Sequence, residues 1–316
     1  MLLGSPLTEL LLLAGGAALL YAGAELLVKG ASDLALAVGL KASTVGVTVI
    51  AFATTAPELF VSLLGAVTVS TDVGLGTILG SNIANIGLVL GVSALIRPLN
   101  VSETVFKRHV PFMVLAALLL VGLGWNGRIG RPGGLLLLGT LVAFTLVVMR
   151  RVRQTQSGIS TAERAEMPDA SLRDVTAVVG GIAALVLGSQ WLIDGGESLL
   201  SAAGFSDIFI GLTVLALGTS LPELAASVVA AVRGEAEFSV GNVVGSNIYN
   251  VLAVIGIIAV IRPIGVSPGV RGFEFPALLA FTAGLVGIMF RSQRISRVDG
   301  AVLVAGYGVF AYLLFP

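Results

Sequence analysis

The sequence predicts an all-α polytopic membrane protein with ten transmembrane helices, arranged as two inverted five-helix repeats. Three observations support this fold class. The composition is strongly apolar, the apolar residues gather into segments long enough to cross a bilayer, and the two halves of the chain match each other at a fixed spacing. The first two observations place the chain in a membrane, and the third sets the relation between its halves.

The composition is that of a membrane protein. Of the 316 residues, 56% are hydrophobic and 11% are charged, and the mean hydropathy is +1.02. A soluble domain usually carries about 25% charged residues. The 41 glycines suit a helical bundle in lipid, because small residues let helix backbones approach closely. The net charge of zero gives no indication of nucleic-acid binding, and the absence of cysteine excludes thiolate metal sites and disulfides.

Ten segments are long and apolar enough to approach the roughly 20 residues that a spanning helix needs. The first of them lacks a preceding basic region and a cleavage site, so we expect a retained helix and no signal peptide. A polar stretch predicts a linker at 150–173, between a first five-helix repeat at 1–149 and a second at 174–316. The predicted helices are 8–28, 44–67, 74–96, 109–123, 132–149, 174–193, 208–232, 238–261, 273–290 and 299–315.

The distribution of basic residues predicts the orientation, because cytoplasmic loops carry an excess of Lys and Arg. With the N-terminus outside, the inner loops hold 14 of the 18 basic residues and the outer loops hold 4. We therefore expect a protein of the cytoplasmic (inner) membrane with both termini extracytoplasmic and a cytoplasmic linker. The outer four are Arg128, Arg131, Arg262 and Arg271.

The two halves match at one constant offset, without gaps between the matching blocks. Residues 46–62 (GVTVIAFATTAPELFVS) align with 211–227 (GLTVLALGTSLPELAAS), with nine identities in 17 positions. Residues 76–85 (GTILGSNIAN) align with 241–250 (GNVVGSNIYN), with six identities in ten. Because each repeat has an odd number of helices, the second inserts in the opposite direction. Many secondary transporters have this design and bind substrate near the midplane, where the repeats meet.

Each repeat contributes one deeply placed carboxylate. Glu58 is the single charge of segment 44–67, and Glu223 is the single charge of segment 208–232. A charge at the bilayer centre costs about 2.5–3.5 kcal/mol on insertion scales. No Lys or Arg lies in the predicted helix interiors to offset that cost, so a bound cation is the simplest partner. Protonated glutamates hydrogen-bonded inside the bundle are the alternative.

Oxygen-bearing groups surround both glutamates in the sequence. Pro57 and Pro222 precede them, and a proline leaves the carbonyl four residues back without its helical partner. We therefore expect free carbonyls at Ala53 and Gly218. Calcium takes 6–8 oxygen ligands in a flexible cage, and sodium takes fewer of the same kind. The predicted side-chain ligands besides the two glutamates are Thr54, Thr55, Ser81, Asn85, Thr219, Ser220, Ser246 and Asn250; for Asn82 and Asn247 we expect hydrogen bonds to neighbouring helices instead.

The paired blocks ATTAPE and GTSLPE, each followed by GSNI and a second asparagine, resemble the two alpha repeats of the cation/calcium exchanger superfamily, with prokaryotic sodium/calcium antiporters the most similar branch. The resemblance covers nearly the whole chain. It implies ten helices with the second, third, seventh and eighth around the ions. It implies Glu58 and Glu223 as shared carboxylates. It also implies ion contacts from the six hydroxyl residues above and from the carbonyls of Ala51 and Ala216.

The sequence departs from the superfamily pattern at two places. Ala53 and Thr55 stand where Gly and Ser are usual, which keeps the hydroxyl and adds a methyl group. Asn250 stands where several relatives carry Asp, which leaves two core carboxylates instead of three. Two carboxylates neutralise one calcium ion, and an acidic residue at this position accompanies potassium use in some relatives.

These features predict a secondary active antiporter that exchanges calcium for sodium by alternating access, with calcium and sodium ions and the lipid bilayer as its partners. We expect no cofactor and no enzymatic activity, because the sequence has no HExxH motif, no cysteine and a single histidine, His109, for which we expect a structural or interfacial role. The alternatives are a calcium/proton antiporter of the same superfamily and a passive cation channel.

Overall fold

The computed structural model describes residues 6–37, 39–40, 42–55, 58–59, 62–63, 71–157, 169–203 and 218–314. Among them, eight helices are long and apolar enough to cross a membrane. The predicted helices 44–67 and 208–232 lie partly outside the described residues, so the total of ten stays a prediction. The eight are Leu7–Ala37, Gly74–Ile96, Val105–Gly124, Arg131–Gln154, Leu172–Ala202, Ala236–Ile261, Pro268–Ser292 and Arg297–Leu314.

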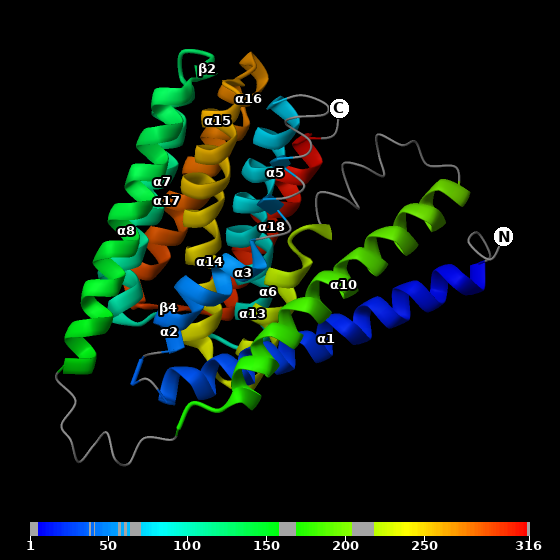
Figure 1. The fold of residues 1–316 in the computed structure, drawn as a ribbon. Coiled ribbons are helices and arrows are strands. Elements are labelled where there is room, and N and C mark those ends of the chain that lie inside the picture. The colour runs from blue at the N-terminus through cyan, green and yellow to red at the C-terminus, as the bar shows by residue number, and fades with distance from the viewer. Residues whose placement is uncertain are drawn as a thin grey trace.

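Helices make up both halves of the described chain (Figure 1). The elements of the first half are α1 (Pro6–Ala37), α2 (Ala42–Val45), the π-helical turn η1 (Gly46–Ile50), α3 (Ala51–Thr54), α5 (Thr71–Ala84), the π-helical turn η2 (Asn85–Leu90), α6 (Gly91–Ile96), β1 (Leu99–Asn100), the π-helical turn η3 (Val105–His109), α7 (Val110–Gly124), β2 (Arg128–Ile129) and α8 (Arg131–Ser157).

The second half repeats most of this order. Its elements are α10 (Leu172–Ala202), α13 (Leu221–Arg233), α14 (Ala236–Tyr249), the π-helical turn η5 (Asn250–Ile255), α15 (Gly256–Ile261), β3 (Ile264–Gly265), α16 (Pro268–Gly272), α17 (Glu274–Ser292), β4 (Arg294–Ile295) and α18 (Arg297–Leu314).

The constant offset of the sequence repeat recurs in the element boundaries. The alignment that pairs Gly76 with Gly241 also pairs four consecutive elements of each half, and each pair begins and ends at equivalent residues. The paired elements are α5 with α14, η2 with η5, α6 with α15, and β1 with β3. Two short antiparallel sheets join the halves, β1 with β4 and β2 with β3. Because β1 corresponds to β3 and β2 to β4, exchanging the halves turns one sheet into the other. This is the contact pattern of a pseudo-two-fold axis between the halves.

The equivalent helices α1 and α10 pack against each other side by side along their length and run in opposite directions (Figure 1). A Cβ atom at Gly16 would lie 2.8 Å from the carbonyl oxygen of Gly188, and one at Gly181 would lie 2.7 Å from that of Gly23. These two contacts exchange under the repeat alignment, since Gly16 corresponds to Gly181 and Gly23 to Gly188. Glycine at these positions therefore lets two backbones meet, as in other tightly packed membrane helices.

Helices α1 and α10 are longer than the sequence predicted. They span 32 and 31 residues, against the expected segments 8–28 and 174–193. The polar residues Glu25 and Lys29 suggested an end to the first apolar run, but the helix continues through them, and Glu25 forms an ion pair with Arg233 at 2.5 Å. At 1.5 Å per residue α1 is about 48 Å long, more than a hydrocarbon core of about 30 Å. Both helices lie oblique to the rest of the bundle (Figure 1).

Part of the predicted linker 150–173 is helical. Helix α8 continues to Ser157, because Arg and Gln in its last turns are good helix formers outside the apolar segment. At the other end α10 begins at Leu172, after a capping box. The Asp174 backbone N–H donates to the Ser171 hydroxyl, and the Ser171 backbone N–H donates to the Asp174 carboxylate. Residues 158–168 lie outside the described residues.

The spans Gly74–Ile96 and Ala236–Ile261 form the centre of the bundle. They are 78% and 83% buried, whereas the other six spans are 22–44% buried. Helix α14 packs against η1, α2, α3 and α13, and its partner in the repeat, α5, packs against η5 and α17. Most side chains on either central span are therefore enclosed by protein.

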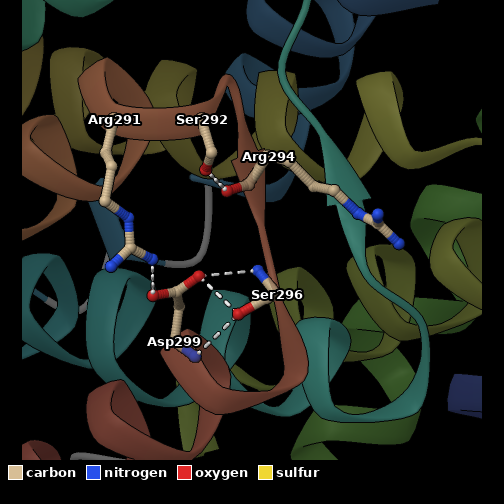
Figure 2. A network of polar contacts seen from close by, with 5 residues as sticks. All are labelled: Arg291, Ser292, Arg294, Ser296 and Asp299. Carbon is tan, nitrogen blue, oxygen red and sulfur yellow. Dashed lines mark hydrogen bonds and ion pairs between the residues drawn. The ribbon is translucent and has the colours of Figure 1, made fainter.

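The two sheets mark opposite ends of the bundle (Figure 1). The end with β1 and β4 carries most of the basic residues, and the turn into α18 is fixed there by a polar network (Figure 2). Asp299 accepts hydrogen bonds from the Ser296 backbone at 2.9 Å and its hydroxyl at 2.6 Å, and pairs with Arg291 at 2.9 Å. The capped start of α18 holds the β1–β4 end together.

We predict that Gly188→Ala lowers the thermal stability of the protein. A methyl group at Gly188 meets the carbonyl oxygen of Gly16 at 2.7 Å, and overpacking of this kind costs about 1–3 kcal/mol. Thermal unfolding in detergent measures the change. Gly180→Ala is the matched control, because the same helix offers open space there. Equal melting temperatures for the two variants would contradict the close packing of α1 and α10.

Candidate functional site

Glu58 and Glu223 lie together at the centre of the structure. Both side chains are 0% exposed, and their carboxyl groups interact directly with each other. Glu223 is the third residue of α13, after Pro222 in the first turn, and the positive end of that helix favours a negative charge there. The two halves of the chain therefore place one acid each at a single buried point, as the repeat predicted.

The chain breaks its helical run just before each glutamate. Helix α3 ends at Thr54 with Thr55 in a turn, and Thr219 and Ser220 form a turn before α13. The backbone N–H of Leu59 bonds to the carbonyl of Thr55 at 3.0 Å, and that of Leu224 bonds to Ser220 at 3.0 Å. The repeat thus gives both glutamates the same local geometry, with hydroxyl groups within a turn of each acid.

Two hydroxyl groups stand beside Glu223. The hydroxyl of Ser246 donates to Glu223 Oε1 at 3.5 Å, and the Thr54 hydroxyl lies against the same carboxyl group. Thr54 comes from the first half and Ser246 from the central helix α14. These two predicted ligands therefore contact Glu223 directly.

The remaining side-chain oxygens of the predicted site are buried and lack partners. No hydrogen bond from the described residues reaches either carboxylate oxygen of Glu58 or the Oε2 of Glu223. An unpaired buried polar atom is costly and rare, so a cluster of them indicates a missing polar partner. Among the predicted ligands the same holds for Thr55 Oγ1, Ser81 Oγ, Asn85 Oδ1, Thr219 Oγ1, Ser220 Oγ and Asn250 Oδ1.

Asn85 and Asn250 begin the π-helical turns η2 and η5. Single π turns in α-helices are rare and frequently lie at functional sites. Turn η2 packs against α13 and α14, and η5 packs against α5, so each asparagine lies at the junction of the two halves. The amide of Asn250 donates to Asn82 Oδ1 at 3.0 Å.

The expectation for Asn82 is confirmed, because its partner Asn250 lies on the opposite half. The expectation for Asn247 is wrong, since its amide bonds to the carbonyl of Val243 in its own helix at 2.9 Å. The α-helical spacing of four residues brings that carbonyl within reach and needs no second helix.

The expected free carbonyl at Gly218 has a partner after all. Ser189 of α10 donates its hydroxyl to the Gly218 oxygen at 2.6 Å, so this carbonyl is not an unsatisfied ligand as predicted. Proline removes the helical donor, but tertiary packing supplies another one. Ala51 is described and buried, whereas Ala216 and Pro57 lie outside the described residues.

Asn242 is a functional candidate that the sequence reasoning missed. Its Oδ1 accepts from the Thr54 hydroxyl at 3.4 Å, and its amide donates to the Ser227 hydroxyl at 3.2 Å, so it links Thr54 to α13 across the two halves. All three are buried. Its position four residues before Ser246 was the available signal, since residues four apart share a helix face.

The composition of the site fits a hard cation as a transported substrate. The described residues hold no group of three or more His, Cys, Asp and Glu side chains. The site instead combines two carboxylates with neutral hydroxyl and amide oxygens. Oxygen ligands of this kind suit calcium and sodium, and the absence of sulfur and imidazole from the described part of the site disfavours softer metals.

Comparison with known proteins places these features in context. A family described as sodium/calcium exchanger protein matches residues 8–150 and 174–315. The putative antiporter CaxA of Alkalimonas amylolytica is 35% identical over 95% of this chain and 96% of its own. The sodium/calcium exchanger MaX1 of Methanosarcina acetivorans is 28% identical over 95% and 96%. The solved structure of the sodium-calcium exchanger NCX_Mj covers 98% of this chain and 100% of its own, at 25% identity and a TM-score of 0.84.

We predict that Asn82→Ala weakens ion binding about 2- to 10-fold. The substitution removes the acceptor that orients the Asn250 amide, and one buried hydrogen bond contributes about 0.5–1.5 kcal/mol. Calorimetric titration of the purified protein with calcium measures the change. Asn247→Ala is the matched control from the other repeat, because it removes only a bond within α14. Equal losses in both variants would contradict a positioning role for Asn82.

Proposed function

The chain belongs to the sodium/calcium exchanger protein family, and we propose that it is a secondary active antiporter that exchanges calcium for sodium across the cytoplasmic membrane by alternating access. The observation that carries the proposal is the contact between two fully buried carboxyl groups, Glu58 and Glu223, inside a membrane bundle. The names of the relatives MaX1 and NCX_Mj, which specify sodium and calcium, support this choice of ions.

A bound cation balances the charge of the acid pair. Two like charges in contact in a low-dielectric interior repel strongly, and each costs several kcal/mol to desolvate. The ion pairs found among the described residues involve other acids, at Glu103, Glu25 and Asp299. One calcium ion neutralises both glutamates, and sodium ions neutralise them by binding to overlapping oxygen atoms.

The proposed ion ligands are the side chains and carbonyls that the sequence predicted. The unpartnered oxygens of the described residues support most of this set and would help to complete the 6–8 ligands that calcium takes. The Ala51 carbonyl already accepts from the Thr55 backbone N–H at 3.0 Å, and the Thr54 and Ser246 hydroxyls lie against Glu223. The carbonyls of Ala51 and Ala216 enter through the resemblance to the exchanger superfamily. The set is Glu58, Glu223, Thr54, Thr55, Thr219, Ser220, Ser81, Ser246, Asn85, Asn250, Ala51 and Ala216.

The architecture proposed for transport is ten helices in two inverted five-helix repeats, with residues 1–149 and 174–316 as the repeats and 150–173 between them. Supporting this, equivalent helices α1 and α10 run antiparallel, and the two sheets exchange under the repeat alignment. A two-fold axis that relates two antiparallel helices, here α1 and α10, is perpendicular to them. Because the helices cross the membrane, this axis lies in the plane of the membrane. The excess of basic residues at one end favours a cytoplasmic linker and extracytoplasmic termini.

Obligatory occupancy couples the two ion fluxes. An empty site would carry two adjacent negative charges through the occluded state, which is costly in the membrane interior. Only a site loaded with calcium or with sodium changes its access readily from one side of the membrane to the other. Each calcium ion moved in one direction therefore requires sodium to move in the other direction. Sodium that enters down its gradient then drives calcium out.

We predict that Glu58→Gln and Glu223→Gln each reduce sodium-driven calcium flux to the level of empty vesicles. Either substitution keeps the side-chain shape but removes one of the two charges that neutralise calcium. Uptake of calcium-45 into proteoliposomes measures the flux. Glu25→Gln is the control, since that acid pairs with Arg233 away from the site and its loss leaves the flux near that of the unsubstituted protein. Normal flux in either site variant would refute the ion assignment.

We further predict that a sodium gradient alone drives calcium-45 uptake, whereas potassium or proton gradients imposed singly do not. The expectation rests on the two-carboxylate site, in which Asn250 replaces a third acid. Uptake driven by a pH gradient without sodium would identify the protein as a calcium/proton antiporter. Calcium flux that needs no counter-ion and does not saturate would identify a passive channel.

A further inference from the structure

A cavity at the β1–β4 end of the bundle lies outside the ion site. It has a volume of about 250 Å³ and opens between α2, η3, α7 and α8. Its lining includes Thr44, Thr104, Arg108, His109 and Arg151. The ion-site residues do not border it, so its chemistry is separate from that of the glutamate pair.

The polar lining of this cavity is cationic. Arg108 and Arg151 contribute two positive charges, and no Asp or Glu lies among its described lining residues. Arg108 has no acidic partner within the described part of the chain, and Arg151 donates only to the neutral Gln154, at 2.9 Å. A cavity with two arginines and no acid favours an anionic group, and arginine in particular suits phosphate.

His109 adds an independent sign of a ligand. Its side chain is 4% exposed, and its Nδ1 atom has no hydrogen-bond partner among the described residues. The ring is held edge-on to Phe144, with centroids 6.1 Å apart. A buried ring nitrogen without a partner, on the wall of a cationic cavity, indicates a polar group that the cavity receives.

A second, more apolar cavity adjoins the first. It has a volume of about 360 Å³ and shares Phe144, Val148 and Val152 with the first cavity. Its further lining comprises Thr48, Thr145, Met149, Arg153 and Tyr249, so its wall is mostly apolar and carries one basic residue. The pair therefore offers a cationic chamber joined to a more apolar one along α8.

The position of the two cavities matches the edge of a bilayer. Helix α8 changes from apolar residues through Met149 to basic residues at Arg150, Arg151 and Arg153. This transition marks the depth at which hydrocarbon gives way to head groups. Basic cavities between membrane helices at the positively charged end are suited to anionic lipid head groups.

We propose that this pair of cavities is a binding site for an anionic phospholipid. The phosphate group lies between Arg108 and Arg151 and accepts a hydrogen bond from the His109 ring, and one acyl chain follows Phe144 and Val148 into the apolar cavity. The acyl chain contacts Tyr249, whose ring meets those of Phe52 and Phe144 at 5.6 and 6.3 Å. Since Phe52 belongs to α3 and Tyr249 precedes Asn250, the lipid supports two elements that border the ion site.

Native mass spectrometry of the purified full-length protein tests the site. We expect phosphatidylglycerol to remain bound after detergent exchange, and phosphatidylcholine with the same acyl chains to bind at least about tenfold more weakly. The double variant Arg108→Ala, Arg151→Ala should lose at least about tenfold in phosphatidylglycerol affinity, as expected from losing charge-assisted hydrogen bonds. Met149→Trp, at a position 48% exposed on the apolar cavity, should weaken both lipids.

Arg150→Ala is the matched control, because this arginine has the same charge on the same helix but lines neither cavity. Equal phosphatidylglycerol affinity in Arg150→Ala and the double variant overturns the proposal. Inorganic phosphate that binds as tightly as the lipid, with no effect of Met149→Trp, also overturns it in favour of a free-anion site. Lipid that binds only after Glu163→Gln and Glu166→Gln would mean that these two linker residues occupy the cavity, and it likewise overturns the proposal.

Discussion

The contact between Glu58 and Glu223 is the constraint on which the rest of the structure depends. Two carboxyl groups at 0% exposure in the centre of a membrane bundle are stable only when their charge is balanced. Each comes from a different half of the chain, so the halves must meet at this point. The turns before both glutamates and the π-helical turns at Asn85 and Asn250 all bring oxygen atoms toward that junction. The proposed ion would supply that balance at the centre of the bundle.

The periphery of the bundle follows from a different force. Glycines on α1 and α10 let the two backbones approach closely, since a Cβ atom added at these glycines would lie only 2.7–2.8 Å from a carbonyl oxygen of the facing helix. The same kind of contact joins Gly91 to Gly300 and Gly134 to Gly256. Apolar burial does little between helices that lipid would cover equally well, so close backbone packing provides the attraction. Glycine thus accounts for how α1 and α10 attach to each other, and for how α18 and α8 attach to the two central spans.

The sequence predicted the repeat, the paired acids and most helices. Identical Pro-Glu and Gly-Ser-Asn blocks at one constant offset are hard to explain except by two equivalent halves. Prediction from the sequence failed where tertiary contacts decide the outcome. Helix α1 continues past the predicted end at residue 28 to Ala37, and its Glu25 pairs with Arg233 from the other half of the chain. The Gly218 carbonyl depended on Ser189, and the role of Asn242 depended on Thr54 from the other half. No local sequence pattern encodes such tertiary partners. The depth of a residue in its apolar segment and the periodicity of that segment are local features, so they could be predicted.

Sequence equivalence between the repeats does not make their contacts equivalent. Ser189 donates to the carbonyl of Gly218, but its counterpart in the first half is Ala24, which has no hydroxyl for Ala53. Asn250 bonds to Asn82, whereas both polar atoms of the corresponding Asn85 lack a partner within the described residues. The two halves therefore present different oxygen environments to the shared acid pair. An ion at the proposed site would therefore meet different ligands from the two halves, and the alternating access that we propose would draw on this difference between them.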